Sequence, residues 1–296
     1  MPCPDTRLTA PMLDPRLLRS FVAIADTGSF TQAAERLNMT QSTISQQLAR
    51  LEEAVGRGLI DRVARPVRAT ASGERLLGYA RRILTLQQEA ETMLGDSAGT
   101  ASIRIGVPED IVTGNMAQVF AGFTRHHREI RLDVVAGLSR ELMRRYRAGE
   151  FDIVIVKEPS ASSDHRASYP EAMAWFESAD APESWPEPLP LVTFPPGGLY
   201  RDAMFERIER ERHRWYIALS SSSLYNVVVA VEAGLGLSLL PVGTTAGRRV
   251  RPYEAFGTEP AMVVSIYSWE KGGVIAELVA AMSAVLAQRY GVPAPA

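Results

Sequence analysis

The chain has 296 residues, of which 46% are hydrophobic, and its formal net charge is −2. This length allows a small domain beside a larger one with its own core. No apolar run reaches membrane-spanning length, and the polar start through Ala10 lacks an apolar segment, so we expect neither a membrane protein nor a signal peptide. The single cysteine, Cys3, has no intrachain partner for a disulfide, and we therefore expect a cytoplasmic protein.

The first element along the chain is a helix that we expect to begin at Asp14 and Pro15, an N-cap residue followed by a residue favoured at the first helical position. Met12 is an alternative to Met1 as the natural start. Residues 1–11 are then expected to be a disordered extension without function.

Residues 28–52 predict two short helices joined by a turn at Asn38 and Met39. The first is opened by Ser29 or Thr31 and buries Ala33, Ala34 and Leu37, and small alanines let a second helix cross closely. The second begins after Thr40 as N-cap and has an apolar face and a polar, nearly uncharged face. Amides and hydroxyls on such a face can read base edges in a major groove. The expected DNA contacts are Thr31, Gln32, Gln41, Ser42, Thr43, Ser45, Gln46 and Arg50; the apolar face is Ile44, Leu48, Leu51 and Val55.

A hairpin is expected next, from strand-like runs at residues 59–62 and 67–70. It brings together Arg62, Arg65 and Arg68, which supply the phosphate contacts that the helix face lacks. Residues 1–95 contain twelve arginines, no lysine and ten acidic residues, whereas the rest of the chain is net acidic. This asymmetry favours DNA as the partner of the N-terminal part.

These motifs together resemble the N-terminus of LysR-type transcriptional regulators. The resemblance runs through residues 17–25, 28–30, 33–37 and 40–47, and continues to Thr70-Ala71-Ser72-Gly73, which is similar to the family's Thr-x-x-Gly start of a long helix. Ile60 stands where Phe is usual, and Ser42 where Pro is frequent. The resemblance implies a winged helix-turn-helix domain at 12–71, a linker helix at 72–98 and an effector-binding domain at 99–296.

The linker helix carries residues spaced alternately by four and three, which is typical of a two-helix coiled coil. An alternative is that the helix packs on its own domain. The resemblance implies a dimer contact here, so we expect a homodimer or homotetramer on an operator with two-fold character, with RNA polymerase as a further partner. The expected dimer residues are Leu76, Ala80, Ile83, Gln87, Ala90 and Leu94.

Beyond residue 99, strand and helix patterns alternate and predict an α/β fold with a parallel sheet covered on both faces. The resemblance implies a periplasmic-binding-protein-like domain of two α/β subdomains, the first at about 101–160 plus 266–296 and the second at about 161–265. Ligands of such folds lie between the subdomains, at the carboxyl ends of strands. A small-molecule effector bound there is expected to shift the subdomain angle and so change DNA binding or bending.

Four loops that precede predicted helices, at residues 108–110, 137–140, 195–198 and 220–223, are candidates for this cleft, because hydroxyls and helix N-termini bind polar groups. Plain helix capping is the alternative for each. Glu109 and Asp110 repel a carboxylate ligand unless Arg140 or Lys157 neutralises them. We therefore expect a neutral or cationic effector, or a salt bridge from these acids across the cleft. The expected effector contacts are Pro108, Glu109, Asp110, Ser139, Pro196, Ser220 and Ser221.

An enzyme and a solute-binding protein are the two alternative classes of protein. An enzyme is disfavoured because Gly234-Leu235-Gly236-Leu237-Ser238 is in the wrong order for a nucleophile elbow, the four histidines lack zinc-ligand spacing and no phosphate-binding glycine loop occurs. We expect no catalytic residue, metal site or cofactor. A solute-binding protein fits the C-terminal two-thirds alone, but the attached helix-turn-helix argues against it.

Overall fold

The computed structural model describes residues 13–95 and 101–293. The chain divides into an N-terminal unit of residues 1–99, with which residues 147–150 are grouped, and a C-terminal unit of residues 100–146 and 151–296. The expected extension at 1–11, Cys3 and the end of the linker at 96–98 lie outside the described residues.

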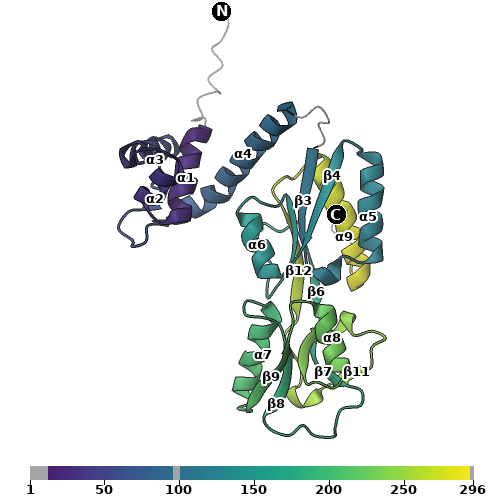
Figure 1. Ribbon diagram of the computed structural model, residues 1–296. Helices are drawn as coiled ribbons and strands as arrows, with labels where there is room; N and C mark the ends of the chain where they lie inside the picture. Colours follow the sequence, from purple (N-terminus) through teal and green to yellow (C-terminus); the bar gives the residue numbers. More distant parts are fainter. Residues whose placement is uncertain (1–12, 96–100, 294–296) are drawn as a thin grey trace, which may run out of the picture. The chain divides into compact units, whose positions relative to one another are not determined.

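The N-terminal unit is a winged helix-turn-helix (Figure 1). Its elements are α1 (Pro15–Thr27), α2 (Phe30–Arg36), α3 (Gln41–Val55), β1 (Ile60–Asp61), β2 (Arg68–Ala69) and α4 (Ala71–Gly95), with β1 and β2 antiparallel. The predicted caps are confirmed: Asp14, Ser29 and Thr40 accept hydrogen bonds from backbone N–H groups in the first turns of α1, α2 and α3. Of the two candidates for the start of α2, Ser29 is the capping residue.

The core of this unit is formed by the apolar faces of all four helices and by the wing. Phe21 of α1 and Leu48 of α3 are fully buried, as is Ala33, where α2 and α3 meet. Ile60, which replaces the usual phenylalanine, is 5% exposed and packs into the same core from the wing. The sequence therefore places its small and branched residues where the helices cross most closely.

The first part of α4 packs on its own unit, contrary to the predicted dimer seam. Ala80 is fully buried, and Leu76 and Ile83 pack against the same core. The alternative of a helix packed on its own domain is thus correct for Ala80, whereas Leu76 and Ile83 are only half-buried by this contact. The four-and-three spacing that suits a partner helix suits α1 equally well. Gln87 and Ala90 lie beyond this contact, and the side chain of Leu94 is outside the described structure.

The C-terminal unit contains a first subdomain built on one five-stranded sheet, in the order β4-β3-β5-β12-β6. Its strands are β3 (Ala101–Val107), β4 (Ile130–Ala136), β5 (Ile153–Glu158), β6 (Ala167–Glu171) and β12 (Met262–Ser268). Helices α5 (Gly114–His126) and α9 (Gly273–Tyr290) cover one face, and α6 (Ser139–Arg147) covers the other (Figure 1). A short 3-10 turn, η1 (Glu109–Ile111), follows β3.

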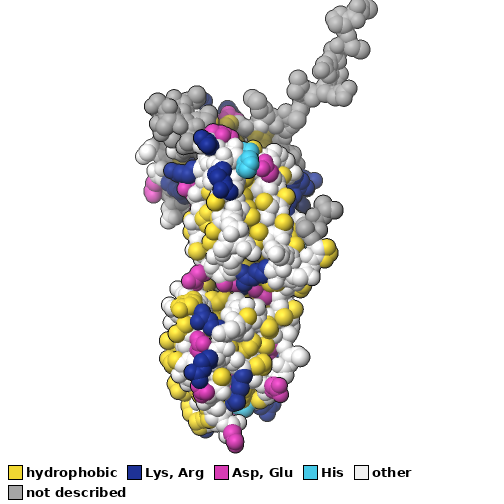
Figure 2. Space-filling view, turned by 90° about the vertical axis from the view of Figure 1, so that its right-hand side faces the viewer, with side chains coloured by type: hydrophobic (Ala, Val, Ile, Leu, Met, Phe, Trp, Pro, Cys, Tyr) yellow, Lys and Arg dark blue, Asp and Glu magenta, His cyan; other side chains and the backbone are white. Residues whose placement is uncertain are grey.

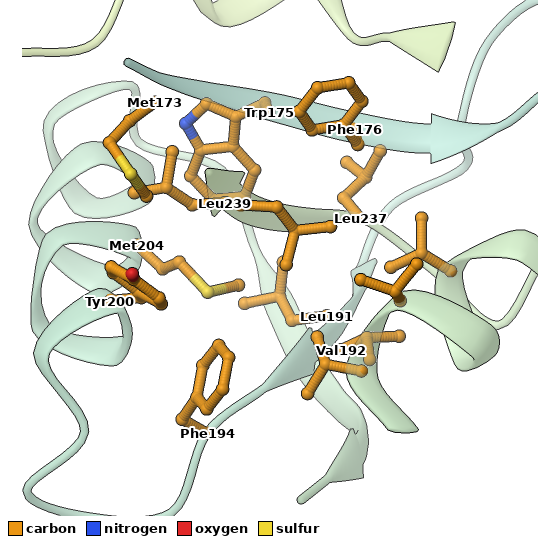
Figure 3. Close-up of a cluster of buried hydrophobic side chains, with 14 of the residues drawn as sticks. Met173, Trp175, Phe176, Leu191, Val192, Phe194, Tyr200, Met204, Leu237 and Leu239 are labelled. Atoms are coloured by element: carbon orange, nitrogen blue, oxygen red, sulfur yellow. The ribbon is translucent and has the colours of Figure 1, made fainter. Parts of the chain in front are cut away.

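The second subdomain is built from two small sheets. Strand β7 (Met173–Ser178) lies between β10 (Ser238–Pro241) and β11 (Val250–Pro252), and β8 (Leu189–Thr193) pairs with β9 (Trp215–Ser220). Helices α7 (Leu199–Arg210) and α8 (Leu224–Glu232) enclose a core that includes Trp175, Leu191 and Met204 (Figure 3). The turns η2 (Val242–Thr244) and η3 (Glu254–Phe256) complete it.

The structure corrects two expectations about this unit. The first sheet is mixed rather than parallel, because β12 runs antiparallel to both β5 and β6. The expected boundaries at 160/161 and 265/266 also shift, since all of β6 and β12 belongs to the first sheet. Strand β6 was not predicted; it contains Pro170, which an edge strand tolerates but which weakens a strand pattern in the sequence.

Helix α9 is long and apolar enough by composition to cross a membrane, which the sequence prediction overlooked. Seven of its residues, among them Leu278 and Met282, are buried within the first subdomain. Its apolar character is therefore used in packing against α5 and the sheet.

Candidate functional site

The polar face of α3 is presented as predicted from residues 41 to 50. Gln41, Ser42, Gln46 and Arg50 are exposed, whereas Thr43 and Ser45 are half-buried. The opposite face, with Ile44 and Leu48, lies in the core. Thr31 and Gln32 of α2 are also exposed.

Gln47 has a different role from its polar neighbours on α3. Its side-chain oxygen accepts a hydrogen bond from the hydroxyl of Ser20, which is fully buried on α1. A buried hydroxyl without such a partner is costly, so this bond fixes α3 against α1. The sequence pattern could not separate Gln47 from the exposed amides beside it.

The wing arginines are all exposed, but their surroundings differ. Arg62 donates to the carboxylate of Glu52 at 2.9 Å, and that carboxylate also accepts from the backbone N–H groups of Leu59 and Ile60. Arg65 donates to two backbone carbonyls at the wing tip, and Arg68 lies on β2. Glu52 therefore anchors the wing to α3, a role that the sequence analysis missed.

A cavity of about 500 Å³ lies between the two subdomains of the C-terminal unit, within the usual range for a small-molecule site. Figure 2 shows acidic and basic side chains meeting where the surface narrows between these subdomains. The cavity is bounded by the carboxyl ends of strands and the starts of the following helices, as expected. It is lined by Pro108, Glu109, Asp110, Ala136, Gly137, Leu138, Ser139, Lys157, Phe194, Gly198, Leu199, Tyr200, Ser222, Ser223 and Leu224.

Four of the seven predicted effector contacts line this cavity, namely Pro108, Glu109, Asp110 and Ser139. Pro196, Ser220 and Ser221 do not line it. Ser220 ends β9 and Ser223, rather than Ser221, caps α8, and Ser222 and Ser223 line the cavity from this loop. The sequence analysis also missed the aromatic wall formed by Phe194 and Tyr200. The Ser139 hydroxyl accepts from the backbone N–H of Lys157 at 2.9 Å and so joins α6 to β5.

A buried ionic cluster borders the cavity, and Asp110 and Lys157 are its members in the cavity lining. The Lys157 ammonium lies 2.7 Å from Asp110 and 3.0 Å from Glu171, and the side chains of Lys157 and Glu171 are 4% and 2% exposed. Arg289 of α9 donates to both the carboxylate and the backbone carbonyl of Asp110. Lys157 therefore neutralises Asp110, which is one of the two possibilities that the sequence left open for this carboxylate, the other being Arg140.

Two phenols complete this cluster. Tyr200 of α7 and Tyr290 of α9 each donate to the Glu171 carboxylate, at 3.1 and 3.0 Å. Burial, followed by the nearby Glu171 charge, raises the pKa of both tyrosines well above the ordinary value of 10.0. Both phenols therefore remain protonated donors, and Glu171 links the two subdomains at the crossover between β6 and β7.

Two polar contacts cross the cleft directly. Arg140 at the start of α6 pairs with Asp202 of α7 at 2.6 Å, and the Ser223 hydroxyl donates to Glu109 at 3.0 Å. The expected salt bridge from Glu109 or Asp110 across the cleft is not found among the described residues; the ion pair that crosses the cleft joins Arg140 and Asp202. Glu109 makes a hydrogen bond in its place.

A winged helix-turn-helix joined to a two-subdomain unit with a ligand-sized cleft defines a transcriptional regulator with an effector-binding domain. Residues 15–74 match the family model described as "Bacterial regulatory helix-turn-helix protein, lysR family", and residues 97–289 match "LysR substrate binding domain". The chain belongs to the LysR family of transcriptional regulators.

Curated relatives agree with this assignment, and solved structures share the fold. The regulator DgdR of Burkholderia cepacia is 30% identical over 76% of each chain, and PecT of Dickeya dadantii is 32% identical over 78% of this chain and 73% of its own. Full-length LysG from Corynebacterium glutamicum with bound effector Arg has a TM-score of 0.58 at 20% identity, covering 91% of this chain and 96% of LysG. ArgP from Mycobacterium tuberculosis scores 0.53 at 21% identity, covering 95% and 99%. At these identities the two structures show the shared fold.

Proposed function

We propose that this regulator binds an operator in double-stranded DNA as a dimer-based assembly, with α3 reading base edges and the wing arginines holding phosphates. The observation that carries the proposal is the exposed, nearly uncharged polar face of α3 beside an exposed arginine-bearing wing on the same unit. A neutral face can discriminate bases but cannot neutralise phosphates, so α3 supplies the base contacts and the wing arginines supply the phosphate contacts. On the same grounds we propose a cytoplasmic, non-enzymatic regulator with RNA polymerase as a further partner.

The proposed control is a shift between closed and open forms of the cleft. The contacts Arg140–Asp202 and Ser223–Glu109 join the subdomains, and Glu171 accepts hydrogen bonds from a phenol of each. An effector that binds one cleft geometry better than another shifts the population toward it. A change in subdomain angle is then carried to the spacing of the two DNA-binding units in the assembly.

Separate substitutions in the wing and in α3 test the DNA contacts. We expect Arg65→Ala to weaken binding to all duplexes and to reduce the slope of log affinity against log salt by about 1, because one phosphate contact is lost. We expect Gln41→Ala to relax preference at one base position, with a cost of about 1–3 kcal/mol on the best site alone. Both are measured by titrating operator and scrambled duplexes at several salt concentrations. Altered sequence preference in Arg65→Ala with an unchanged salt slope would contradict the division of roles.

We propose that the dimer face of α4 keeps Ile83 and Ala90 of the predicted seam but has Tyr79 and Leu86 in place of Ala80 and Gln87. Tyr79 and Leu86 are 60% and 43% exposed, Ala90 is exposed and Ile83 is half-buried. In chain order, residues 79, 83, 86 and 90 are separated by four, three and four positions. This spacing forms one stripe beside the face that packs on α1. A partner helix is proposed to cover this stripe.

Two acidic substitutions distinguish the two seams. Leu86→Glu places a charge in the proposed contact and is expected to convert dimers to monomers at micromolar concentration, measured by sedimentation velocity. Gln87→Glu introduces the same charge one position away and is expected to leave the dimer intact. The reverse pattern would restore the original seam with Gln87 at its centre.

A further inference from the structure

The charges that face the effector cleft are not balanced. Three lining residues carry charge, Glu109, Asp110 and Lys157. The Lys157 ammonium is held between Asp110 and Glu171 and also lies 5.6 Å from the centre of the Tyr200 ring. With its side chain only 4% exposed, Lys157 has no free charge to offer an incoming anion.

The neighbouring cations are also engaged. Arg289 donates to Asp110, and Arg140 pairs with Asp202 at the cleft edge. On the other side of Glu109, a second cavity includes Arg248, which lies 3.6 Å from Glu232 and over the Tyr225 ring. An anionic ligand in the cleft thus meets cations whose charge is already compensated.

Glu109 is the exception among these charged groups. Its side chain is exposed and accepts a hydrogen bond from the neutral hydroxyl of Ser223. Within residues 13–95 and 101–293 no ion pair to Glu109 is found. Ser223 accepts in turn from the backbone N–H of Asn226, so its proton is directed to Glu109 Oε1. In the same part of the chain no donor to the second carboxylate oxygen is found, and Glu109 lines the cavity.

The rest of the cavity wall suits an apolar body. Leu138, Leu199 and Leu224 line it beside Phe194 and Tyr200, whose rings meet edge to face at 5.3 Å. Aromatic faces attract cations as well as apolar groups. The site therefore combines one uncompensated carboxylate with an aromatic and aliphatic wall.

We propose that the cleft takes an organic cation, an ammonium or amidinium group carried on a small apolar body, with Glu109 as its counter-ion. This inference rests on the proposed effector control and names the chemical class of the effector. The cationic group binds Glu109 from the first subdomain, while the apolar body lies against Phe194 and Leu199 from the second. A carboxylate ligand in the same place meets the Glu109 charge with no free cation to offset it.

Matched pairs of small ligands test this charge preference on the full chain. Benzylamine and benzamidine are compared with benzoate and benzyl alcohol, and isopentylamine with isovalerate, at equal concentration and ionic strength. Thermal unfolding is followed by tryptophan fluorescence, since Trp175, Trp185, Trp215 and Trp269 all lie in the C-terminal unit. We expect each cation to raise the midpoint of unfolding more than its matched anion or alcohol does.

The variant Glu109→Gln removes the counter-ion and keeps the side-chain size. We expect it to weaken binding of the best cation roughly tenfold or more, because a charge-assisted contact is replaced by a neutral one. Glu183→Gln is the matched control; it removes the same charge from an exposed residue that does not line the cavity, and it is expected to bind the cation as the wild type does.

Cation binding that is lost in Glu109→Gln and kept in Glu183→Gln supports Glu109 as the counter-ion. Stronger stabilisation by the carboxylates, cation binding that persists in Glu109→Gln, or no stabilisation by any cation of the set overturns it. Duplex binding by the same wild-type preparation is measured separately at low salt, so a failure of the proposed DNA function is recognised independently of the ligand result.

Discussion

Replacement of Lys157 by methionine is expected to lower the free energy of unfolding of the C-terminal unit by about 3–5 kcal/mol. The methionine keeps most of the side-chain volume but leaves Asp110 and Glu171 facing each other without the ammonium between them. Arg289 still compensates Asp110, so the cost falls on Glu171, which is 2% exposed. The phenols of Tyr200 and Tyr290 can solvate this carboxylate but cannot neutralise it.

The measurement is urea unfolding followed by tryptophan fluorescence, which reports on the C-terminal unit because all four tryptophans lie there. Arg140→Met serves as the matched control: its ion pair with Asp202 is half exposed on both sides, and we expect a loss of at most about 1 kcal/mol. Adding Glu171→Gln to Lys157→Met is expected to recover much of the stability, because the uncompensated charge is removed. A Lys157→Met loss as small as that of Arg140→Met would contradict a buried ionic cluster.

The helix-turn-helix could be predicted closely because its signals are local. Ser29 and Thr40 act within three residues of their own positions, and the apolar spacing of Ile44, Leu48 and Leu51 identifies the buried face of α3 without any tertiary information. The four cleft loops could be located for a similar reason, since each follows a strand with a clear apolar run.

What the sequence left unresolved depends on contacts between distant segments. Lys157 ends an apolar strand and has no local signal for its position between Asp110 and Glu171. Ser221 and Ser223 are equally good caps in the sequence, and only the end of β9 at Ser220 decides which one starts α8. The face of α4 that packs on α1 has the same four-and-three spacing as a dimer seam. Ala80, which is buried within its own unit, was therefore predicted to contact a second subunit.

The glycine of Thr70-Ala71-Ser72-Gly73 can now be explained by the packing of the wing. The Thr70 hydroxyl donates to the Gly58 carbonyl at 2.8 Å and accepts from the backbone N–H of Gly73 at 3.1 Å, which starts α4 directly beside β1. A Cβ at position 73 would lie 2.0 Å from the carbonyl oxygen of Leu59. That oxygen already accepts from the backbone N–H of Thr70 and cannot move without opening the base of the wing.

Gly73→Ala is therefore expected to destabilise the N-terminal unit by about 3 kcal/mol, although helix propensity alone predicts a gain of up to about 1 kcal/mol. Because the wing carries Arg62, Arg65 and Arg68, duplex affinity should fall at every sequence. The measurements are duplex titration and hydrogen exchange of α1 to α4 amides in the full chain. Tryptophan fluorescence should give an unchanged unfolding midpoint, since the tryptophans lie in the other unit.

Gly58→Ala provides the comparison, because a Cβ at position 58 meets no atom within 4 Å and the backbone there is not left-handed. Its effect on stability is expected to stay within about 0.5 kcal/mol, with duplex binding retained. If Gly73→Ala bound duplex as Gly58→Ala does, the close contact with Leu59 would not be what requires glycine at the start of α4. If it lost binding with unchanged amide exchange, Gly73 would act on DNA directly rather than through the placement of the wing.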